Sequence, residues 1–210
     1  MRMWFVRRRN CAKFHVTLDD EAEVVALMRA ARAKARGYAD FFGWGIDRDL
    51  EEFGVISSLS ESLKADGILF FSDLKQRGRP NDPPDCEALD KNGLRIALEV
   101  TELVDEDAIC AFKQGRVYDW AEWSSDRFIS TLAQLVMRKD GRFPDLKGPP
   151  YDGGYVVVVH TDEPMLSRSI VEEFLTGCRF NKPSYVNRAF IILSYDPAVK
   201  RYPYFELDFH

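Results

Sequence analysis

The sequence predicts an α/β (α+β) fold in which a central mixed β-sheet is flanked by helices. Two near-continuous runs of β-branched and apolar residues, Tyr155–His160 (YVVVVH) and Ala189–Tyr195 (AFIILSY), indicate buried strands. Between them, Ser167–Gly177 (SRSIVEEFLTG) has the pattern of a helix. Strands this apolar, with a helix between them, favour a sheet that helices cover on both faces.

The composition predicts one domain. A chain of 210 residues that is 46% hydrophobic and 30% charged is long enough to bury a full core, and no window has the composition of a linker. We therefore expect a single domain over 1–210, with a strand and helix extension at 1–45 and a core at 46–210.

The elements before the centre of the chain follow from apolar spacing. Alternating residues at 14–18 predict a short strand, and Asp19 or Asp20 caps a helix that runs to about Gly37. The core begins with a helix over about 47–65. Its apolar residues recur at helical spacing and are Leu50, Phe53, Ile56, Leu59 and Leu63.

A loop and a hairpin follow. Segment 75–85 (KQRGRPNDPPD) predicts a loop, because its three prolines exclude regular strand pairing. Cys86–Ala88 and Leu94–Val100 then predict two strands around Asn92-Gly93. The remaining predicted elements are helices at 106–113 and 118–139 and an edge strand at 204–209.

Charge and cysteine content exclude several classes of protein. A net charge of −5 argues against a protein that coats nucleic acid by bulk electrostatics, although Arg29, Arg32, Lys34 and Arg36 concentrate positive charge on the early helix. The four cysteines are scattered, with no CxxC pair, which is typical of reduced thiols in a cytoplasmic protein. No segment approaches the length of a membrane span, so we expect no membrane partner.

The predicted hairpin has two registers, and burial decides between them. A two-residue loop mixes polar and apolar side chains on both faces, whereas a three-residue loop, with Gly93 left-handed in a bulge, pairs Asp90 with Leu94 and Asp85 with Glu99. In the second register one face is an apolar core, made of Cys86, Ala88, Leu94, Ile96, Leu98 and Val100. The other face is expected to be wet and carries Asp85, Glu87, Arg95, Ala97, Glu99 and Thr101.

This register predicts a metal site. Directly opposed side chains have Cβ atoms about 4.5–5.5 Å apart, where the unpaired carboxylates of Asp85 and Glu99 repel each other. A divalent cation removes the repulsion, and Mg²⁺ or Mn²⁺ prefers oxygen ligands. We therefore expect Mg²⁺, or Mn²⁺, as the cofactor.

These residues resemble the core of the PD-(D/E)xK nucleases, the restriction-endonuclease-like superfamily. Pro84-Asp85, a hairpin and Glu99-Val100-Thr101 are similar to its Asp after a loop and its acid-x-Lys tripeptide on the next strand, which bind Mg²⁺ and activate a water. From about Asp47 to the C-terminus the order of elements is similar too: a helix carrying an acid, the hairpin, a helical segment, a strand, a helix and closing strands. The resemblance implies that Asp85, Glu99 and the carbonyl of Val100 hold the metal.

The chain departs from the family at Thr101, which stands where the motif has lysine and cannot supply its positive charge. Some members of the superfamily take the lysine from a following helix, and two candidates exist. Lys113 lies close to the buried edge of the next predicted helix, and Lys139 continues the inner stripe of the helix at 118–139. We prefer Lys113 because it is nearer the motif in sequence, and assign Lys139 to nucleic-acid binding together with Arg79.

A further acid, Glu52, is expected from the first core helix to complete or modify the metal site. Glu52 precedes Ile56 by four residues and Leu59 by seven, so it lies on their face. A solvated carboxylate that favours the helix dipole is the alternative interpretation.

Other candidates are weaker. His160 ends a buried strand and is either a base, a ligand or a hydrogen-bonded histidine, of which we favour the last. Tyr118, Trp120 and Trp123 can stack on bases, although their helical spacing favours the core.

The predicted function is a Mg²⁺-dependent nuclease that hydrolyses phosphodiester bonds in DNA, with RNA as the second choice. The loop that contains Arg79 and the basic early helix would approach the substrate. One alternative is a catalytically degenerate nuclease fold that binds nucleic acid or protein, which Thr101 favours. Another is a protein-interaction component of a defence or toxin system, where acidic charge suits a basic partner. A homodimer is left open.

Overall fold

A computed structural model of the chain describes residue 26 and residues 48–117 and 122–210. The chain divides into two compact units, Met1–Lys34 and Ala35–His210, and every element named below belongs to the second. The strand expected at 14–18, the basic helix expected at 19–37 apart from Ala26, and Tyr118 and Trp120 lie outside the described residues.

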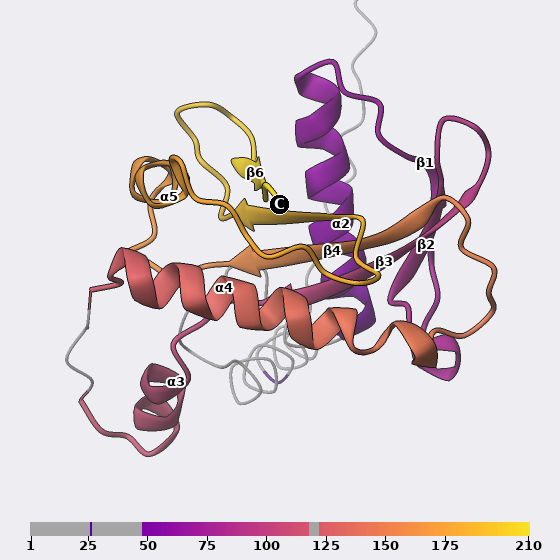
Figure 1. Ribbon diagram of the computed structural model, residues 1–210. Coiled ribbons are helices and arrows are strands. Elements are labelled where there is room, and N and C mark those ends of the chain that lie inside the picture. The colour runs from indigo at the N-terminus through magenta and orange to yellow at the C-terminus, as the bar shows by residue number, and fades with distance from the viewer. Residues whose placement is uncertain (1–25, 27–47, 118–121) are drawn as a thin grey trace, which may run out of the picture. The chain divides into compact units, whose positions relative to one another are not determined.

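Six strands form one mixed sheet in the order β1-β2-β3-β4-β5-β6 (Figure 1). The pairs β1–β2 and β2–β3 are antiparallel, the pairs β3–β4 and β4–β5 are parallel, and β6 is antiparallel to β5. Their bounds are Ser72–Gln76 (β1), Cys86–Leu89 (β2), Arg95–Glu102 (β3), Gly154–Thr161 (β4), Arg188–Leu193 (β5) and Tyr204–Glu206 (β6). The mixed sheet flanked by helices is therefore confirmed, as an α+β fold.

Helices cover both faces of this sheet. In Figure 1, α4 lies on the near side of the strands and α2 on the far side, while α3 lies apart from the sheet. The helices of the described part are α2 (Arg48–Ala65), α3 (Glu106–Lys113), α4 (Ser125–Asp140) and α5 (Arg168–Leu175), with 3-10 turns η1 (Arg79–Asn81) and η2 (Phe143–Asp145). The helix expected at 118–139 thus begins later, at Ser125, after Ser124 caps it by accepting a hydrogen bond from the Arg127 N–H.

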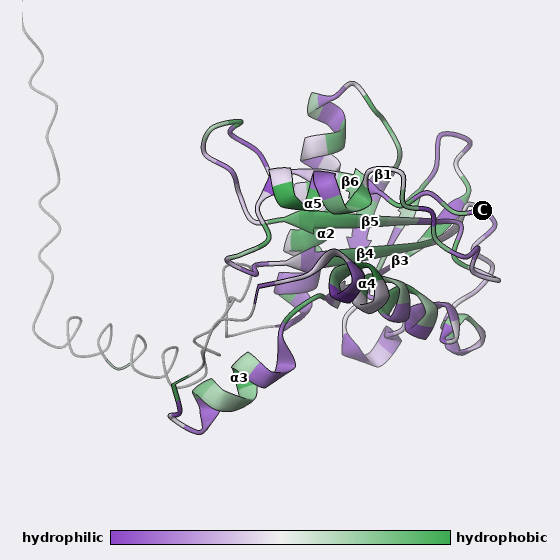
Figure 2. Ribbon diagram, turned by 60° about the vertical axis from the view of Figure 1, so that its left-hand side comes forward, coloured by the Kyte–Doolittle hydropathy of each residue, from purple (hydrophilic) through white to green (hydrophobic). Residues whose placement is uncertain are grey.

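Two hydrophobic cores result, one on each face of the sheet. In Figure 2 strands β4 and β5 are coloured almost entirely as hydrophobic. Both faces of these strands are apolar because alternate residues enter the core on one side of the sheet and the core on the other. The α2 core includes Val55, Ile56, Leu59 and Leu63 with Ile96, Leu98, Val156, Val158 and Phe190. The α4 and α5 core includes Phe128, Leu132, Val136 and Val171 with Ala97, Val157, Val159 and Ile191.

The register expected for the hairpin is confirmed. Strands β2 and β3 pair Cys86 with Leu98 and Leu89 with Arg95. The same register, continued by one residue past Cys86, puts Asp85 beside Glu99. The Asp90 N–H donates to the Leu94 carbonyl at 2.8 Å, and Gly93 has a φ of 79°, which favours glycine. Burial of one apolar face therefore selected the observed strand pairing.

Two expectations about this region are wrong. The start of segment 75–85 is not loop, because Lys75 and Gln76 belong to β1 and pair with β2; this short edge strand is mostly exposed and lacks an apolar alternation. The face of β3 that carries Glu99 is not wet either. Helix α4 and its core cover it, and Ala97 and Glu99 are both fully buried.

Candidate metal centre

Asp85 and Glu99 lie side by side in the interior, where the hairpin register puts them. Asp85 is 4% exposed and Glu99 0% exposed. One oxygen of each is compensated: Asp85 Oδ2 accepts a hydrogen bond from the Val100 N–H at 2.7 Å, and the Tyr155 hydroxyl donates to Glu99 Oε2. Burial and the neighbouring Glu99 raise the pKa of Tyr155, which keeps that hydroxyl protonated as a donor.

The lysine beside these carboxylates is Lys139. Its Nζ is 3.5 Å from Glu99 Oε1 and 3.9 Å from Asp85 Oδ2, and the residue is 5% exposed. Helical periodicity explains this position, because Lys139 follows Leu132 by seven residues and Val136 by three, and both enter the core. Lys139 thus turns inward at the end of α4.

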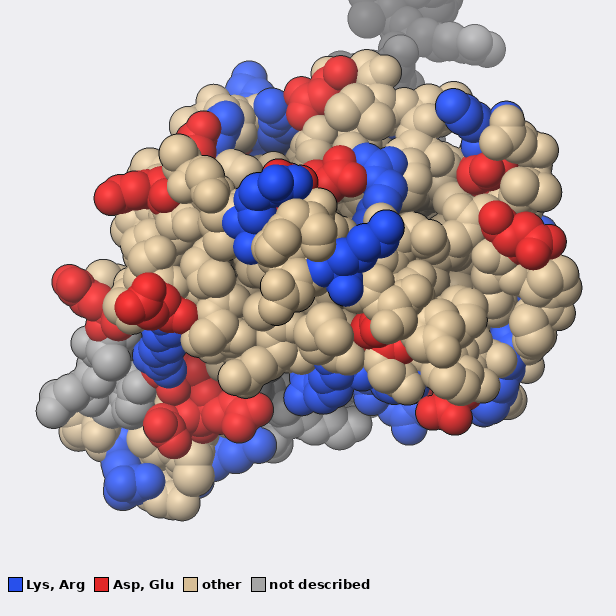
Figure 3. All heavy atoms as spheres, in the orientation of Figure 1, with Lys and Arg blue, Asp and Glu red and all other residues tan. Residues whose placement is uncertain are grey.

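The lysine that the structure places at these acids is Lys139 and not the preferred Lys113. Lys113 is the exposed last residue of α3, which lies away from the sheet (Figure 2). In Figure 3 both acidic and basic side chains lie at the lower left, where Figure 1 has α3. Glu106 and Asp107 stand in the first turn of α3, and Lys113 stands in its last turn.

Asp82 is a third acid of the site that the sequence reasoning missed. Asp82, Asp85 and Glu99 each offer a carboxylate oxygen, and these oxygens lie within 4.8 Å of one another. The only signal in the sequence is that Asp82 precedes Asp85 by three residues, within Asp82-Pro83-Pro84-Asp85. Loop conformation rather than periodicity brings it to the cluster, so spacing rules did not find it.

The cluster retains acceptor capacity. Asp82 Oδ1, Asp85 Oδ1 and Glu99 Oε1 are buried and have no hydrogen-bond partner among the described residues. Burial raises the pKa of Asp85 from 3.8 to about 7; Lys139 and the Val100 N–H oppose this shift, and the nearby Glu52 and Glu99 add to it. Three carboxylate oxygens that converge and accept no hydrogen bond fit a hard divalent cation such as Mg²⁺ or Mn²⁺.

A cavity of about 630 Å³ adjoins this cluster. Glu52 lines it and is paired with Arg48 at 2.6 Å, while burial raises the pKa of Glu52. Thr101 also lines it and accepts a hydrogen bond from Arg138 Nη2 at 3.4 Å. The full lining is Arg48, Glu51, Glu52, Val100, Thr101, Glu102, Arg138, Lys139, Arg142 and His160.

Of the remaining candidate residues, Val100 and His160 line the cavity and Arg79 does not. Val100 lines the cavity and gives its N–H to Asp85, and its carbonyl as a ligand stays a prediction. Arg79 in η1 has a side chain 77% exposed, with Nε 3.9 Å from Asp49 Oδ1, outside the cavity lining. His160 is buried at the end of β4 and reaches the same cavity.

Trp123 belongs to the core, as its spacing favoured. It is 6% exposed and its Nε1–H donates to Glu163 Oε2 at 3.1 Å. The guanidinium of Arg127 covers the ring, 4.2 Å from its centroid. This tryptophan therefore offers no free face on which a base could stack.

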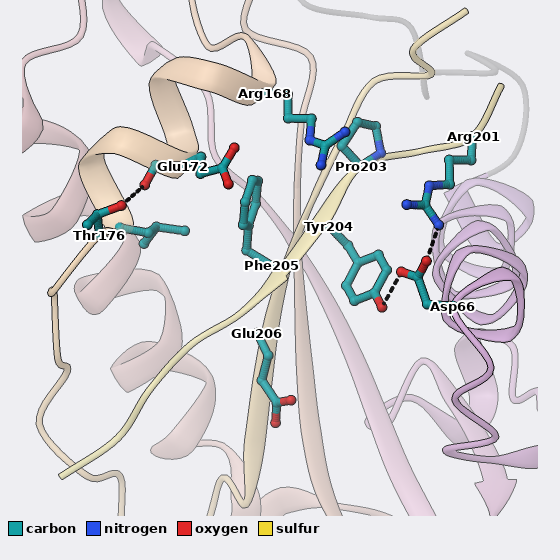
Figure 4. Close-up of a pocket in the computed structure, with 10 residues that line it drawn as sticks. Asp66, Arg168, Glu172, Thr176, Arg201, Pro203, Tyr204, Phe205 and Glu206 are labelled. Carbon is teal, nitrogen blue, oxygen red and sulfur yellow. Dashed lines mark hydrogen bonds and ion pairs between the residues drawn. The ribbon is translucent and has the colours of Figure 1, made fainter. Parts of the chain in front are cut away.

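Another pocket, of about 460 Å³, lies beside β6 between α5 and the end of α2 (Figure 4). Two of its acids are compensated, and the first is Asp66, which accepts hydrogen bonds from Arg201 and, at 2.9 Å, from the Tyr204 hydroxyl. Glu206 takes two hydrogen bonds from Arg188, at 2.5 and 2.6 Å. This pocket holds no convergent buried acids among the described residues, so the Asp85 cluster is the better candidate.

Comparison with known proteins adds no assignment: no protein-family model, no curated protein and no solved structure matches the chain. Among the described residues, no helix combines the length and the apolar character that crossing a membrane requires.

Proposed function

We propose that the protein is a Mg²⁺-dependent nuclease that hydrolyses phosphodiester bonds in DNA. The observation that carries the proposal is the convergence of Asp85, Glu99 and Lys139. An Asp that precedes one strand, an acid on the next strand and a nearby lysine are the elements of the PD-(D/E)xK site. The order of elements, from the acid-bearing α2 through the β2-β3 hairpin to β4, supports the same superfamily.

Asp85, Glu99 and Asp82 would hold the metal, with the Val100 carbonyl as a further candidate ligand. When bound, Mg²⁺ lowers the pKa of a water and neutralises charge that develops on the scissile phosphate. Tyr155 fixes the orientation of Glu99, and the Val100 N–H fixes that of Asp85. Residues of the sheet would thus orient two of the three candidate ligands, Asp85 and Glu99.

Lys139 takes the part that Thr101 cannot. Its ammonium, held between Asp85 and Glu99, would orient the attacking water and stabilise charge on the phosphate. The lysine thus comes from α4 rather than from β3, as it does in those members of the superfamily that take it from a following helix. Thr101 keeps a smaller task, as acceptor for Arg138 on the cavity wall.

Cleavage of supercoiled plasmid tests the proposal. We expect nicking by the purified protein with Mg²⁺ or Mn²⁺ and none in EDTA. Glu99→Gln, which keeps the size of the side chain, should abolish it, while the surface variant Lys113→Met should cleave as the unaltered protein does. Equal cleavage by Glu99→Gln would mean a contaminant or another site, and the nuclease proposal would fail.

A second candidate is a protein of the same fold that binds DNA without cutting it, and Thr101 is the observation that favours it. Binding of a fluorescent duplex in Ca²⁺, together with intact plasmid after long incubation in Mg²⁺ and Mn²⁺, would support this candidate over the enzyme.

A further inference from the structure

Arg142, the residue before η2, spans two acids of the metal cluster. Its Nη1 is 3.2 Å from Glu99 Oε1 and its Nη2 is 3.7 Å from Asp82 Oδ1. Both carboxylates are members of the triad whose oxygens lie within 4.8 Å of one another. The guanidinium therefore neutralises the same groups that a divalent cation would use.

These contacts are ion pairs without hydrogen-bond geometry. Glu99 Oε1 and Asp82 Oδ1 are both without a hydrogen-bond partner among the described residues. By contrast, Arg188 holds Glu206 through two short hydrogen bonds, at 2.5 and 2.6 Å. Because directed, charge-assisted hydrogen bonds are the strong part of such pairs, Arg142 is held more weakly than Arg188.

The Arg142 side chain borders an open cavity. The side chain is 36% exposed and lines the 630 Å³ cavity, which Arg48 and Arg138 also line. Lys139 differs, because it is almost fully buried between the same acids. Of the two cations among the described residues that contact Glu99, Arg142 is therefore the one that borders open space.

The balance of charge favours such an exchange. Asp82, Asp85 and Glu99, when ionised, exceed Lys139 and Arg142 by one negative charge. Adding a divalent cation reverses this to an excess of one positive charge, which is what one phosphodiester group neutralises. A bound metal thus removes the attraction that holds Arg142 on the acids and creates one for an anion.

We propose that Arg142 is an exchangeable counter-ion: its guanidinium occupies Glu99 and Asp82 without metal, yields them to a divalent cation, and then pairs with a phosphate oxygen of the substrate. The inference rests on the metal site of the proposed function and adds to it the residue that recognises the phosphodiester. Arg142 then couples substrate binding to metal binding.

Metal binding is measured first, by titrating the apoprotein with Mn²⁺ alone and following free Mn²⁺ by electron paramagnetic resonance. Arg142→Met should bind Mn²⁺ about tenfold more tightly than the unaltered protein, because the metal no longer competes with the guanidinium. Arg138→Met is the matched control. It removes the same charge from the same cavity but has no contact with the three acids, so its affinity should change less than about twofold.

Substrate binding is measured next, with a fluorescent 20-base-pair duplex in Ca²⁺ and in EDTA. Arg142→Met should weaken binding about tenfold in Ca²⁺ and hardly at all in EDTA, where the guanidinium is engaged by the acids. Arg138→Met should weaken binding similarly in both. An equal loss for Arg142→Met in Ca²⁺ and EDTA would overturn the exchange.

The outcomes separate the two proposals. If Mn²⁺ binds equally to the unaltered protein and to Arg142→Met, the exchange fails while the metal site stands. If neither binds Mn²⁺, the metal site fails and the exchange with it. Should Arg142→Met unfold at lower temperature, Arg142→Lys, which keeps the charge but not the two-pronged guanidinium, gives the same readout with a smaller gain in affinity.

Discussion

Two buried aspartates, Asp85 and Asp140, differ in how the protein compensates their carboxylates. Asp140, at the end of α4, is 5% exposed and accepts three backbone hydrogen bonds, from Tyr185 at 2.7 Å, Val186 at 2.8 Å and Ser184 at 3.0 Å. Asp85 is equally buried but accepts one, and its Oδ1 has no hydrogen-bond partner among the described residues.

The difference distinguishes an anchor from a ligand site. Fixed N–H groups compensate Asp140, which thereby ties the 184–186 turn to α4. Asp85 keeps part of the cost of its burial, as its raised pKa shows, and faces two further acids. A ligand from solution can offset the desolvation free energy that the fold leaves uncompensated at Asp85. We therefore assign a ligand-binding role to Asp85 and a structural role to Asp140.

Exchanging each aspartate for asparagine should give opposite results and the largest effects. Asp85→Asn should lower Mg²⁺-dependent cleavage by about 10³-fold or more without loss of folding, because it removes a metal ligand. Asp140→Asn should lower the free energy of unfolding by about 2–3 kcal/mol, because the new NH₂ group is a donor that faces a backbone N–H donor and cannot accept its hydrogen bond. Cleavage per folded molecule should be unchanged. Plasmid nicking and urea unfolding of both variants check this, and a cleaving Asp85→Asn would contradict it.

The two lysines offer the next comparison. Lys139→Met should lower cleavage about 100-fold, since it removes the ammonium nearest the acids, whereas Lys113→Met on the exposed α3 should change it less than twofold. Single-turnover rates at saturating Mg²⁺ are the measurement. If Lys113→Met proved the more damaging, the site would have to be assembled differently.

The pH dependence of stability should separate the two aspartates further. Because the folded pKa of Asp85 is raised from 3.8 to about 7, its stability contribution is fully present below about pH 4 and is lost as pH rises through 7. Without metal, Asp85→Asn should therefore be more stable than the unaltered protein at pH 8, by about 1–3 kcal/mol, with no such gain at pH 4.

Mg²⁺ affinity should rise between pH 6 and 8, since binding displaces the proton. Urea unfolding and calorimetric titration test both, and a gain that did not depend on pH would refute the assignment.

The smallest effect is expected at Tyr155, which is not itself a candidate metal ligand but donates a hydrogen bond to Glu99, which is one. Tyr155→Phe removes the donor to Glu99 Oε2 and should lower stability by about 1–2 kcal/mol and Mn²⁺ affinity a few-fold. Trp123→Phe, which removes the donor to Glu163 in the same core, should lower stability alone. Similar losses of Mn²⁺ affinity in both variants would show that the effect of Tyr155 is not specific.

Much of the site followed from local rules. The separation of apolar from polar faces selected the hairpin register and so paired Asp85 with Glu99, and helical spacing turned Lys139 and Glu52 toward the core. These features depend on neighbours within one element or one hairpin, where periodicity is reliable.

The rest depended on how elements pack. Sequence distance favoured Lys113, but α3 lies away from the sheet and α4 crosses it. The burial of Glu99 comes from the α4 core, which the hairpin pattern alone does not contain. Ala97, an apolar residue on the face expected to be wet, was the one local hint. Asp82 reaches the cluster through a loop conformation that no period describes.

The most direct test of the account is a crystal structure of the protein in MnCl₂, with diffraction data collected at the manganese edge. We expect an anomalous peak held by carboxylate oxygens of Asp85, Glu99 and Asp82, absent from crystals of Asp85→Asn grown in the same way. Crystals without a peak at these acids, in which Lys139 and Arg142 keep their ion pairs to Glu99, would contradict the claim that the cluster is a metal centre.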